Sequence, residues 1–287
     1  MLEIKNLNYR YEKSSDGLNR VFLNFKENDI TGVIGSNGSG KTTLFKLISN
    51  FLPPPKNTIF FNQIDISKMP LKGQSHISVC FDLPSVINKM TILENLSYYN
   101  ILFKKKEDNI NEILQDLNLV EYKNYRIKNL SYGLKQRVNI AAMLLRDTDV
   151  LIFDEPMNGL DPQSIVILRE LFKKYKEKGK SIIVSAHIIS EIEKIADKII
   201  IFKEGSVIFN DINPQKSNLE FSLISCEFNE QNLIELKKLA IQYFVKSGSS
   251  IKFFITSEKL AMLDNLKNHQ IGLQTSLLED IYYKLSL

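Results

Sequence analysis

The sequence predicts an α/β fold built on a mostly parallel sheet, and two observations support this prediction. Apolar runs of strand length alternate with helical patterns, which is typical of parallel strands joined by crossover helices. Three runs, at residues 30–34, 149–156 and 181–187, are apolar up to their carboxyl ends, as expected of buried strands. The 287 residues suffice for one large domain, or for a domain of about 200 residues with a small appendix.

The first part of the chain is expected to contain strands on both sides of one helix. Alternating apolar and polar residues predict two strands of an antiparallel β patch at 2–11 and 21–25. The buried strand at 30–34 leads through a glycine-rich turn into an amphipathic helix at about 41–50, which three prolines end. Another strand is predicted at 58–66.

The remaining elements alternate between helix and strand. Residues 91–145 are expected to be mainly helical. The strand at 149–156 is followed by a helix at about 162–178, the strand at 181–187, a helix at 188–196 and a hairpin around Glu204–Gly205.

The pattern of predicted strands and helices changes near residue 213. We therefore predict a main domain over residues 1–212 and a small α+β C-terminal extension over 213–287. The extension is expected to contain a short strand, a helix, a hairpin and two further helices.

Composition excludes several classes of protein. Hydrophobic residues make up 44% and charged residues 24%, as in an ordinary globular protein. Cys80 and Cys226 lie far apart, which favours reduced thiols and a cytoplasmic location. The net charge of +4 comes from scattered lysines, and the runs at 103–108 and 173–180 are interpreted as solvated helix ends, so no nucleic-acid partner is expected. No apolar stretch is long enough to span a membrane, and the first residues alternate like a strand rather than a signal peptide.

A glycine-rich stretch, GSNGSGKT, lies between the predicted strand at 30–34 and the helix that follows. It matches the spacing G-x-x-x-x-G-K-[ST] in the strand–turn–helix context that such a phosphate loop requires. Glycines let backbone N–H groups converge on phosphate oxygens, and the helix N-terminus adds its positive end. The predicted nucleotide-binding residues are Gly35, Ser36, Asn37, Gly38, Ser39, Gly40, Lys41, Thr42 and Thr43.

Three further residues are expected at the same edge of the sheet. Asp154 ends a buried strand and can hold Mg²⁺ together with Thr42. Glu155 follows at once, is aimed differently because side chains alternate along a strand, and can accept a proton from an attacking water; the alternative is a helix-cap pair before Pro156. His187 ends the next strand and can donate a hydrogen bond to a γ-phosphate, although a lone His is usually an ordinary satisfied polar residue.

The motifs follow one another in a definite order along the chain. A phosphate loop is followed by LSYGLKQR at 130–137, LIFDEP at 151–156, NGLD at 158–161 and the lone His187. This order resembles the ATP-binding cassette family, the motor subunits of ABC transporters. The resemblance covers residues 1 to about 212 and implies a P-loop NTPase-type sheet with a helical subdomain at about 83–145. It also implies binding and hydrolysis of ATP with Mg²⁺.

The resemblance further implies that two such subunits, identical or different, pair head to tail around two ATP molecules. The signature stretch of each would contact the ATP of the other through Ser131, Gly133, Lys135 and Gln136. Asp161 would lie at the interface, and Tyr11 would stack on adenine; otherwise Tyr11 is an edge-strand residue. Tyr132 and Leu134 depart from the family's signature, but the Ser hydroxyl and the Gly N–H are kept.

Asp82 stands where the family usually has a Gln that contacts the metal and the water. An Asp can also be a ligand of Mg²⁺, but it adds a charge and is shorter, so hydrolysis is expected to be slower or its coupling altered. The ending TSLLEDIYYKL, residues 275–285, is similar to that of cassettes serving drug, antibiotic and bacteriocin exporters.

The resemblance implies an ATPase subunit on the cytoplasmic face of the membrane, held there by separate permease subunits and driving export. One alternative is a soluble ABC-type ATPase acting on nucleic acid or ribosomes, but the long coiled coil or second cassette typical of that class is absent from this sequence. A regulatory module without hydrolysis is another, and Glu155 and His187 argue against it. The transported substrate does not follow from the sequence, because the partner's helices would contact it.

Overall fold

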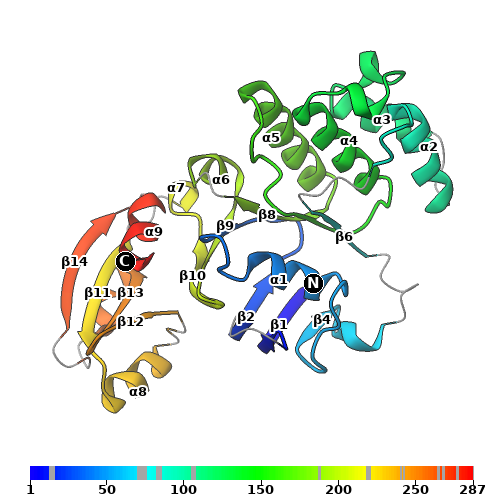
Figure 1. The fold of residues 1–287 in the computed structure, drawn as a ribbon. Helices are drawn as coiled ribbons and strands as arrows, with labels where there is room; N and C mark the ends of the chain where they lie inside the picture. The colour runs from blue at the N-terminus through cyan, green and yellow to red at the C-terminus, as the bar shows by residue number, and fades with distance from the viewer. Residues whose placement is uncertain are drawn as a thin grey trace.

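The computed structural model describes most of the chain. The described residues are 1–12, 17–69, 76–81, 86–104, 108–186, 189–217, 221–239, 241, 243–263, 266, 269–275 and 278–286. The predicted mixed α/β fold with a mainly parallel sheet is confirmed (Figure 1).

A six-stranded central sheet positions the functional residues. Its spatial order is β10–β9–β3–β8–β7–β6, and all neighbours are parallel except β9 and β10. The strands are β3 (Ile30–Ile34), β6 (Ile77–Cys80), β7 (Val150–Phe153), β8 (Ser181–Ala186), β9 (Lys198–Lys203) and β10 (Ser206–Ile212). Strands β9 and β10 form the hairpin predicted around Glu204–Gly205.

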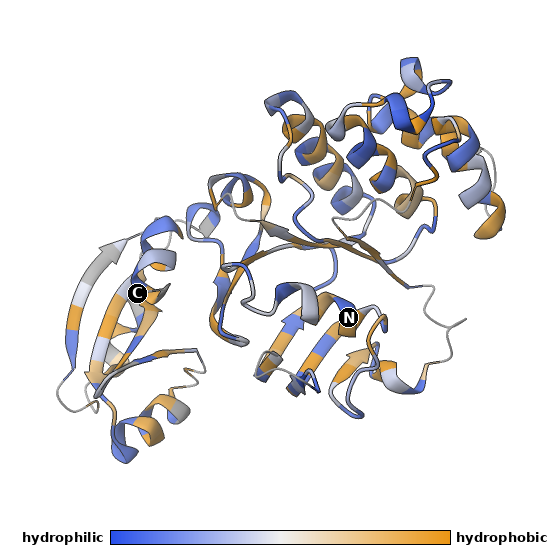
Figure 2. Cartoon of the chain, in the orientation of Figure 1, coloured by the Kyte–Doolittle hydropathy of each residue, from blue (hydrophilic) through white to orange (hydrophobic). Residues whose placement is uncertain are grey.

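The central strands are apolar on both faces because each face has its own hydrophobic core. Leu151 and Phe153 of β7 belong to the core that contains the helices of residues 92–144. Val150 and Ile152 belong to the core that contains the antiparallel sheet and the helix at 41–48. This alternation follows from the two-residue period of a strand. Figure 2 shows the central strands largely in the hydrophobic colour.

A four-stranded antiparallel sheet confirms the predicted β patch. Its order is β2–β1–β4–β5, formed by β1 (Leu2–Arg10), β2 (Gly17–Phe25), β4 (Ile59–Phe61) and β5 (Ile64–Asp65). The single strand predicted at 58–66 is wrong: Asn62 and Gln63 have φ values of 47° and 66°, and this left-handed turn folds the stretch into a tight hairpin.

Helices lie on both faces of the central sheet (Figure 1). Helix α1 (Lys41–Ile48) lies between that sheet and the antiparallel one. On the other face lie α2 (Ile92–Leu102), α3 (Asp108–Asp116), α4 (Tyr132–Leu144), α5 (Pro162–Glu177) and α6 (Ile189–Ile195). Short 3₁₀ turns occur at η1 (Ile66–Lys68), η3 (Val120–Tyr122) and η4 (Ile127–Asn129). Within the described ranges, no helix combines the length and the apolar character needed to cross a bilayer.

After the short helix α7 (Pro214–Ser217) the chain enters a separate antiparallel sheet of order β12–β13–β11–β14. Its elements are β11 (Phe221–Glu227), α8 (Glu230–Lys238), β12 (Val245–Ser247), β13 (Ser250–Thr256), η5 (Ser257–Leu263), β14 (Gln270–Thr275) and α9 (Leu278–Ser286). Two final helices were predicted for this part of the chain, and the first of them corresponds to the 3₁₀ turn η5. Strand β14 was not predicted, because its sequence, QIGLQT, has no clear strand pattern. The domain boundary at 212/213 stays a prediction.

Candidate functional site

The loop between β3 and α1 encloses a pocket of about 260 Å³. Gly40 has a φ of 109°, and a Cβ on it would lie 2.7 Å from a methyl group of Leu18, so only glycine fits this position. The pocket is lined by Tyr11, Gly17, Asn37, Gly38, Ser39, Gly40, Lys41, Thr42, Thr43 and Glu155. The structure therefore brings most of the predicted nucleotide-binding residues together.

Lys41 is a buried cation at this pocket, only 4% exposed. Its Nζ donates hydrogen bonds to the carbonyl oxygens of Gly35 (2.8 Å) and Ser36 (3.1 Å) and lies 3.6 Å from Glu155 Oε1. Burial lowers the pKa of Lys41, while the carboxylates of Glu155 and Asp154 act in the opposite direction. A phosphate oxygen could replace these oxygens as the partner of Nζ.

Ser39 Oγ is buried and has no hydrogen-bond partner in the part of the chain that the structure describes. A Cβ on Gly35 would lie 2.5 Å from this oxygen, so the loop closes tightly around it. A buried polar atom without a protein partner can be satisfied by a water molecule, an ion or a ligand. The orphaned hydroxyl, the buried cation and the start of α1 together fit a phosphate group.

Asp154 is held by two hydroxyl groups directly after β7. Thr42 Oγ1 donates to Asp154 Oδ2 and Ser185 Oγ donates to Asp154 Oδ1, each at 2.7 Å. A hydroxyl oxygen beside a carboxylate is the kind of hard donor set that Mg²⁺ prefers. Thr42 and Asp154 thus fit the metal role predicted for them.

Glu155 faces the phosphate pocket, but for a different reason from the one predicted. Strand β7 ends at Phe153, and Glu155 has a φ of 52°, so a left-handed turn rather than strand alternation sets the direction of its side chain. Its backbone N–H donates to Ser185 Oγ at 2.8 Å. The carboxylate is 19% exposed, which leaves it open to a water molecule at the pocket.

Ser185 is a residue that sequence reasoning missed. It is fully buried, and its Oγ accepts from the Glu155 N–H while donating to Asp154. One hydroxyl therefore sets the positions of both acidic residues. The only signal in the sequence was its place near the end of an apolar strand, which does not distinguish it from an ordinary serine.

Tyr11 lines the same pocket. Its hydroxyl is 3.2 Å from Thr43 Oγ1, and its ring meets that of Tyr9 edge-on at 5.2 Å between centroids. Asp82 and His187 lie outside the described residues, so their roles stay predictions.

The signature stretch borders a different pocket, of about 700 Å³. Ser131 caps α4 by accepting the N–H of Leu134 (3.3 Å), and Asp161 caps α5 by accepting from the N–H and Oγ of Ser164 (2.9 and 2.7 Å). A Cβ on Gly133 would lie 3.1 Å from Ser164 Oγ, so this glycine lets the starts of the two helices meet. This pocket shares no lining residue with the phosphate pocket.

The signature residues differ in their exposure. Ser131 is exposed and Lys135 is partly exposed, whereas Gly133 is buried. Gln136 is only 2% exposed, so its side chain lies inside the chain, and its contact with a partner's nucleotide stays a prediction.

Comparison with known proteins decides the family. Residues 18–158 match the family model described as ABC transporter. The lantibiotic transport ATP-binding protein SrtF of Streptococcus pyogenes is 32% identical over 238 residues, which cover 83% of this chain and all of SrtF. The chain belongs to the family of ABC transporter ATP-binding proteins.

Two solved structures resemble this ABC cassette. The first, cbiO1 from Clostridium perfringens, is described as part of the ABC transporter complex cbiONQ; it has a TM-score of 0.68 and 27% identity and covers 84% of this chain and 95% of its own. The second is a dimer of the cassette MJ0796 in a post-hydrolysis state with ADP and Pi, with a TM-score of 0.65, 25% identity and coverage of 74% and 98%. ABC cassettes bind ATP, and the resemblance inferred from the motifs is confirmed.

Proposed function

We propose that this ABC cassette hydrolyses ATP as half of a head-to-tail pair and that the pair powers a separate membrane permease. One observation carries the proposal: Lys41, Thr42 and Glu155 line one pocket, while Ser131 and Asp161 border another. Asp154 lies beside the first pocket, where it accepts a hydrogen bond from Thr42. A signature stretch that does not complete the pocket of its own chain is available to complete that of a second copy. The dimer of MJ0796 supports this arrangement.

The residues of the phosphate pocket have distinct roles in this proposal. Lys41 and the loop N–H groups hold the phosphates, and Thr42 and Asp154 hold Mg²⁺, which neutralises phosphate charge when bound. Glu155 orients a water molecule and accepts its proton. Tyr11 lies at the mouth, where adenine would stack, and His187 and Asp82 keep the roles expected from the family pattern.

Helix α2 offers a surface for the permease. Ile101, Leu102 and Tyr98 are 78%, 56% and 46% exposed, and clustered exposed apolar side chains mark interaction sites. The relative cbiO1 belongs to a transporter complex, and SrtF is a lantibiotic transport protein, which supports export of a peptide, antibiotic or drug. Co-expression with candidate permease subunits, followed by co-purification, tests this part, and failure to form a complex with any of them would count against it.

The replacement Glu155→Gln tests hydrolysis. It keeps the shape of the side chain but removes the proton acceptor, so we expect ATP turnover to fall by about 10²–10⁴-fold while ATP binding is retained and the ATP-bound pair accumulates. Turnover by phosphate release and pairing by size-exclusion chromatography measure these effects. The exposed Glu177→Gln is the matched control and should turn over like the unaltered chain. Unchanged turnover in Glu155→Gln would remove Glu155 from the mechanism.

A further inference from the structure

Four exposed cationic side chains lie in two segments that meet beside the start of α2. Lys89, Lys123, Arg126 and Lys128 are each exposed, and among the described residues none of them forms an ion pair. We name these four residues the basic ledge. Glu94 accepts the N–H of Thr91 at 2.7 Å and caps α2. The hydrogen bonds from Thr91 and, more weakly, the charge of Arg126 lower the pKa of Glu94, but the two side chains form no ion pair.

Backbone hydrogen bonds hold the two segments of the basic ledge side by side. Leu93 N–H donates to Lys123 O (2.9 Å), Ile127 N–H to Met90 O (3.0 Å) and Lys128 N–H to Asn88 O (3.1 Å). Ile127 is completely buried between the exposed Arg126 and Lys128. The inward side chain anchors the segment, so its charged neighbours are presented outward.

Three lysines of α5 differ from the basic ledge because they form ion pairs. Lys173 pairs with Glu170 (2.9 Å), and Lys174 and Lys178 pair with Glu112 (3.2 and 2.6 Å). Their charges are paired with carboxylates, whereas no residue of the basic ledge forms an ion pair in the part of the chain that the structure describes. Neighbouring like charges repel one another, and an anionic partner would relieve this repulsion.

Two exposed apolar side chains accompany the basic ledge. Tyr125 lies between Lys123 and Arg126 and is 55% exposed, and Ile87 is 37% exposed. Cations mixed with aromatic and aliphatic side chains are typical of surfaces that meet the headgroup region of a membrane. The two pockets described above include no residue of the basic ledge, so it suits a flat charged surface better than an inserted acidic peptide.

We propose that the basic ledge binds the anionic headgroups of a phospholipid membrane. The backbone hydrogen bond from Leu93 to Lys123 joins the basic ledge to the start of α2, the helix proposed to face the permease. The expectation that a membrane lies nearby rests on that proposed function, whereas the charge of the basic ledge does not depend on it. Lipid phosphates would act as counter-ions, with Arg126 able to bind one through two N–H groups.

Vesicle co-sedimentation of the purified full chain tests the proposal. We expect binding to phosphatidylcholine vesicles that contain phosphatidylglycerol, little binding to phosphatidylcholine alone, and weaker binding as salt increases. Replacing Lys123, Arg126 and Lys128 by Gln should weaken binding by about a hundredfold, since each basic residue near an anionic membrane contributes roughly fivefold. ATP turnover of the free chain should not change.

The control replaces Lys173, Lys174 and Lys178 by Gln, which removes the same three charges from a chain of net charge +4. It should bind these vesicles like the unaltered chain. Equal losses in both variants would mean that binding follows net charge, and would overturn the proposal. So would an absence of vesicle binding combined with ledge-dependent retention on immobilised polyglutamate, which would indicate an acidic protein segment instead. Because neither arm involves Glu155 or a permease, these outcomes are separate from failure of the proposed function.

Discussion

Ser185 Oγ lies between the two acidic residues of the candidate site and contacts both. It donates to the Asp154 carboxylate at 2.7 Å and accepts from the Glu155 N–H at 2.8 Å. Removal of a group that orients a metal ligand typically lowers metal affinity or activity by about 10–100-fold. At the scale of single residues, the geometry of this site therefore depends on a side chain that need not touch the nucleotide.

Replacing Ser185 by Ala should raise the Mg²⁺ concentration needed for half-maximal ATP turnover by about 10–100-fold, because Asp154 loses the hydroxyl that orients it. Mg²⁺ titration of turnover measures the effect. Ser181→Ala is the matched control: Ser181 is a mostly buried serine at the other end of β8, where its Oγ accepts from the Asn28 N–H at 3.3 Å. If both variants need the same Mg²⁺ concentration as the unaltered chain, Ser185 does not position the metal ligand.

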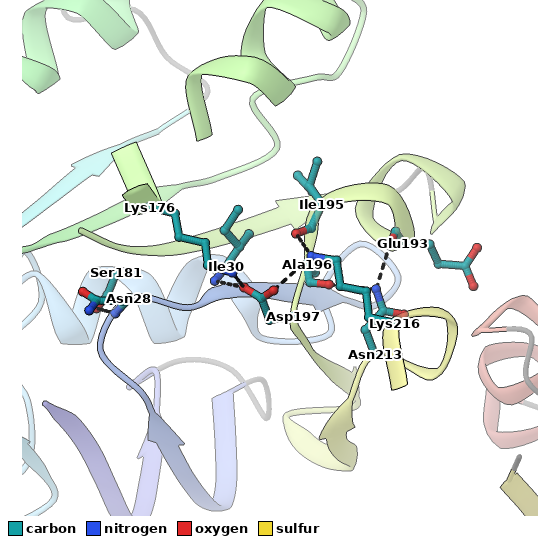
Figure 3. A network of polar contacts seen from close by, with 10 residues as sticks. All are labelled: Asn28, Ile30, Lys176, Ser181, Glu193, Ile195, Ala196, Asp197, Asn213 and Lys216. Atoms are coloured by element: carbon teal, nitrogen blue, oxygen red, sulfur yellow. Dashed lines mark hydrogen bonds and ion pairs between the residues drawn. The ribbon is translucent and has the colours of Figure 1, made fainter. Parts of the chain in front are cut away.

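At the scale of elements, Asp197 joins four segments at the base of the central sheet (Figure 3). Its carboxylate accepts from the Ile30 N–H at the start of β3 (2.8 Å), from Lys176 of α5 (2.7 Å) and from Lys216 of α7 (2.9 Å). Burial by itself would raise the pKa of Asp197, but these hydrogen bonds together lower it. Beside it, Asn213 donates to the carbonyl oxygens of Glu193 and Ala196, each at 2.8 Å.

We expect Asp197→Asn to lower the free energy of unfolding by about 1–2 kcal/mol at pH 7. This value lies in the lower part of the range for a hydrogen-bonded charged group, because solvent partly screens the site. The pKa of this carboxyl is lower when folded, so its contribution is present above the unfolded pKa and is lost as pH falls through the folded one. Urea unfolding at pH 7 and at successively lower pH should show the difference shrinking below about pH 4.

The exposed Glu170→Gln, which breaks a surface pair with Lys173, is the control for Asp197→Asn and should change the free energy of unfolding by less than about 0.5 kcal/mol. A stability difference for Asp197→Asn that stays constant with pH would contradict an electrostatic origin.

At the scale of the whole molecule, the predicted C-terminal extension shares a hydrophobic core with earlier elements of the chain. Leu278, Ile281 and Leu285 of α9 belong to the same hydrophobic core as Ile189 and Ile192 of α6. The N–H of Leu278 donates to the buried carboxylate of Glu193 at 2.8 Å. Burial raises the pKa of Glu193. The extension is thus attached to the helix that begins two residues after His187.

Mixing two inactive variants tests the head-to-tail arrangement. Lys41→Ala disables the phosphate loop and Ser131→Arg blocks the signature stretch, so each variant alone should hardly hydrolyse ATP. A mixed pair retains one intact site, and random pairing of equal amounts should restore about a quarter of the unaltered turnover.

Phosphate release at a series of mixing ratios measures this recovery. Two copies of the same variant provide the control, and no recovery at any ratio would contradict completion of the site by a second copy. Single-subunit ATP binding should survive in Ser131→Arg, because its side chain lies outside the phosphate pocket.

Features set by short stretches of chain could be predicted. The phosphate loop, the buried strands at 30–34 and 181–187 and the helix at 162–178 follow from local patterns of glycine and apolar residues, and the structure has them at nearly these bounds. The hairpin at 58–66 was missed because its turn depends on two non-glycine residues with positive φ. Strand β14 was missed because pairing with β11, rather than its own pattern, makes it a strand.

By itself, the sequence determined the family, the α/β fold class and the residue types of the nucleotide site, because these depend on motifs only a few residues long. Only the tertiary structure decided how those motifs meet. It places Thr42 against Asp154 across 112 positions of the chain, inserts Ser185 between the two acids and buries Gln136. Such contacts arise from the packing of strands and helices far apart in sequence, which local patterns do not encode.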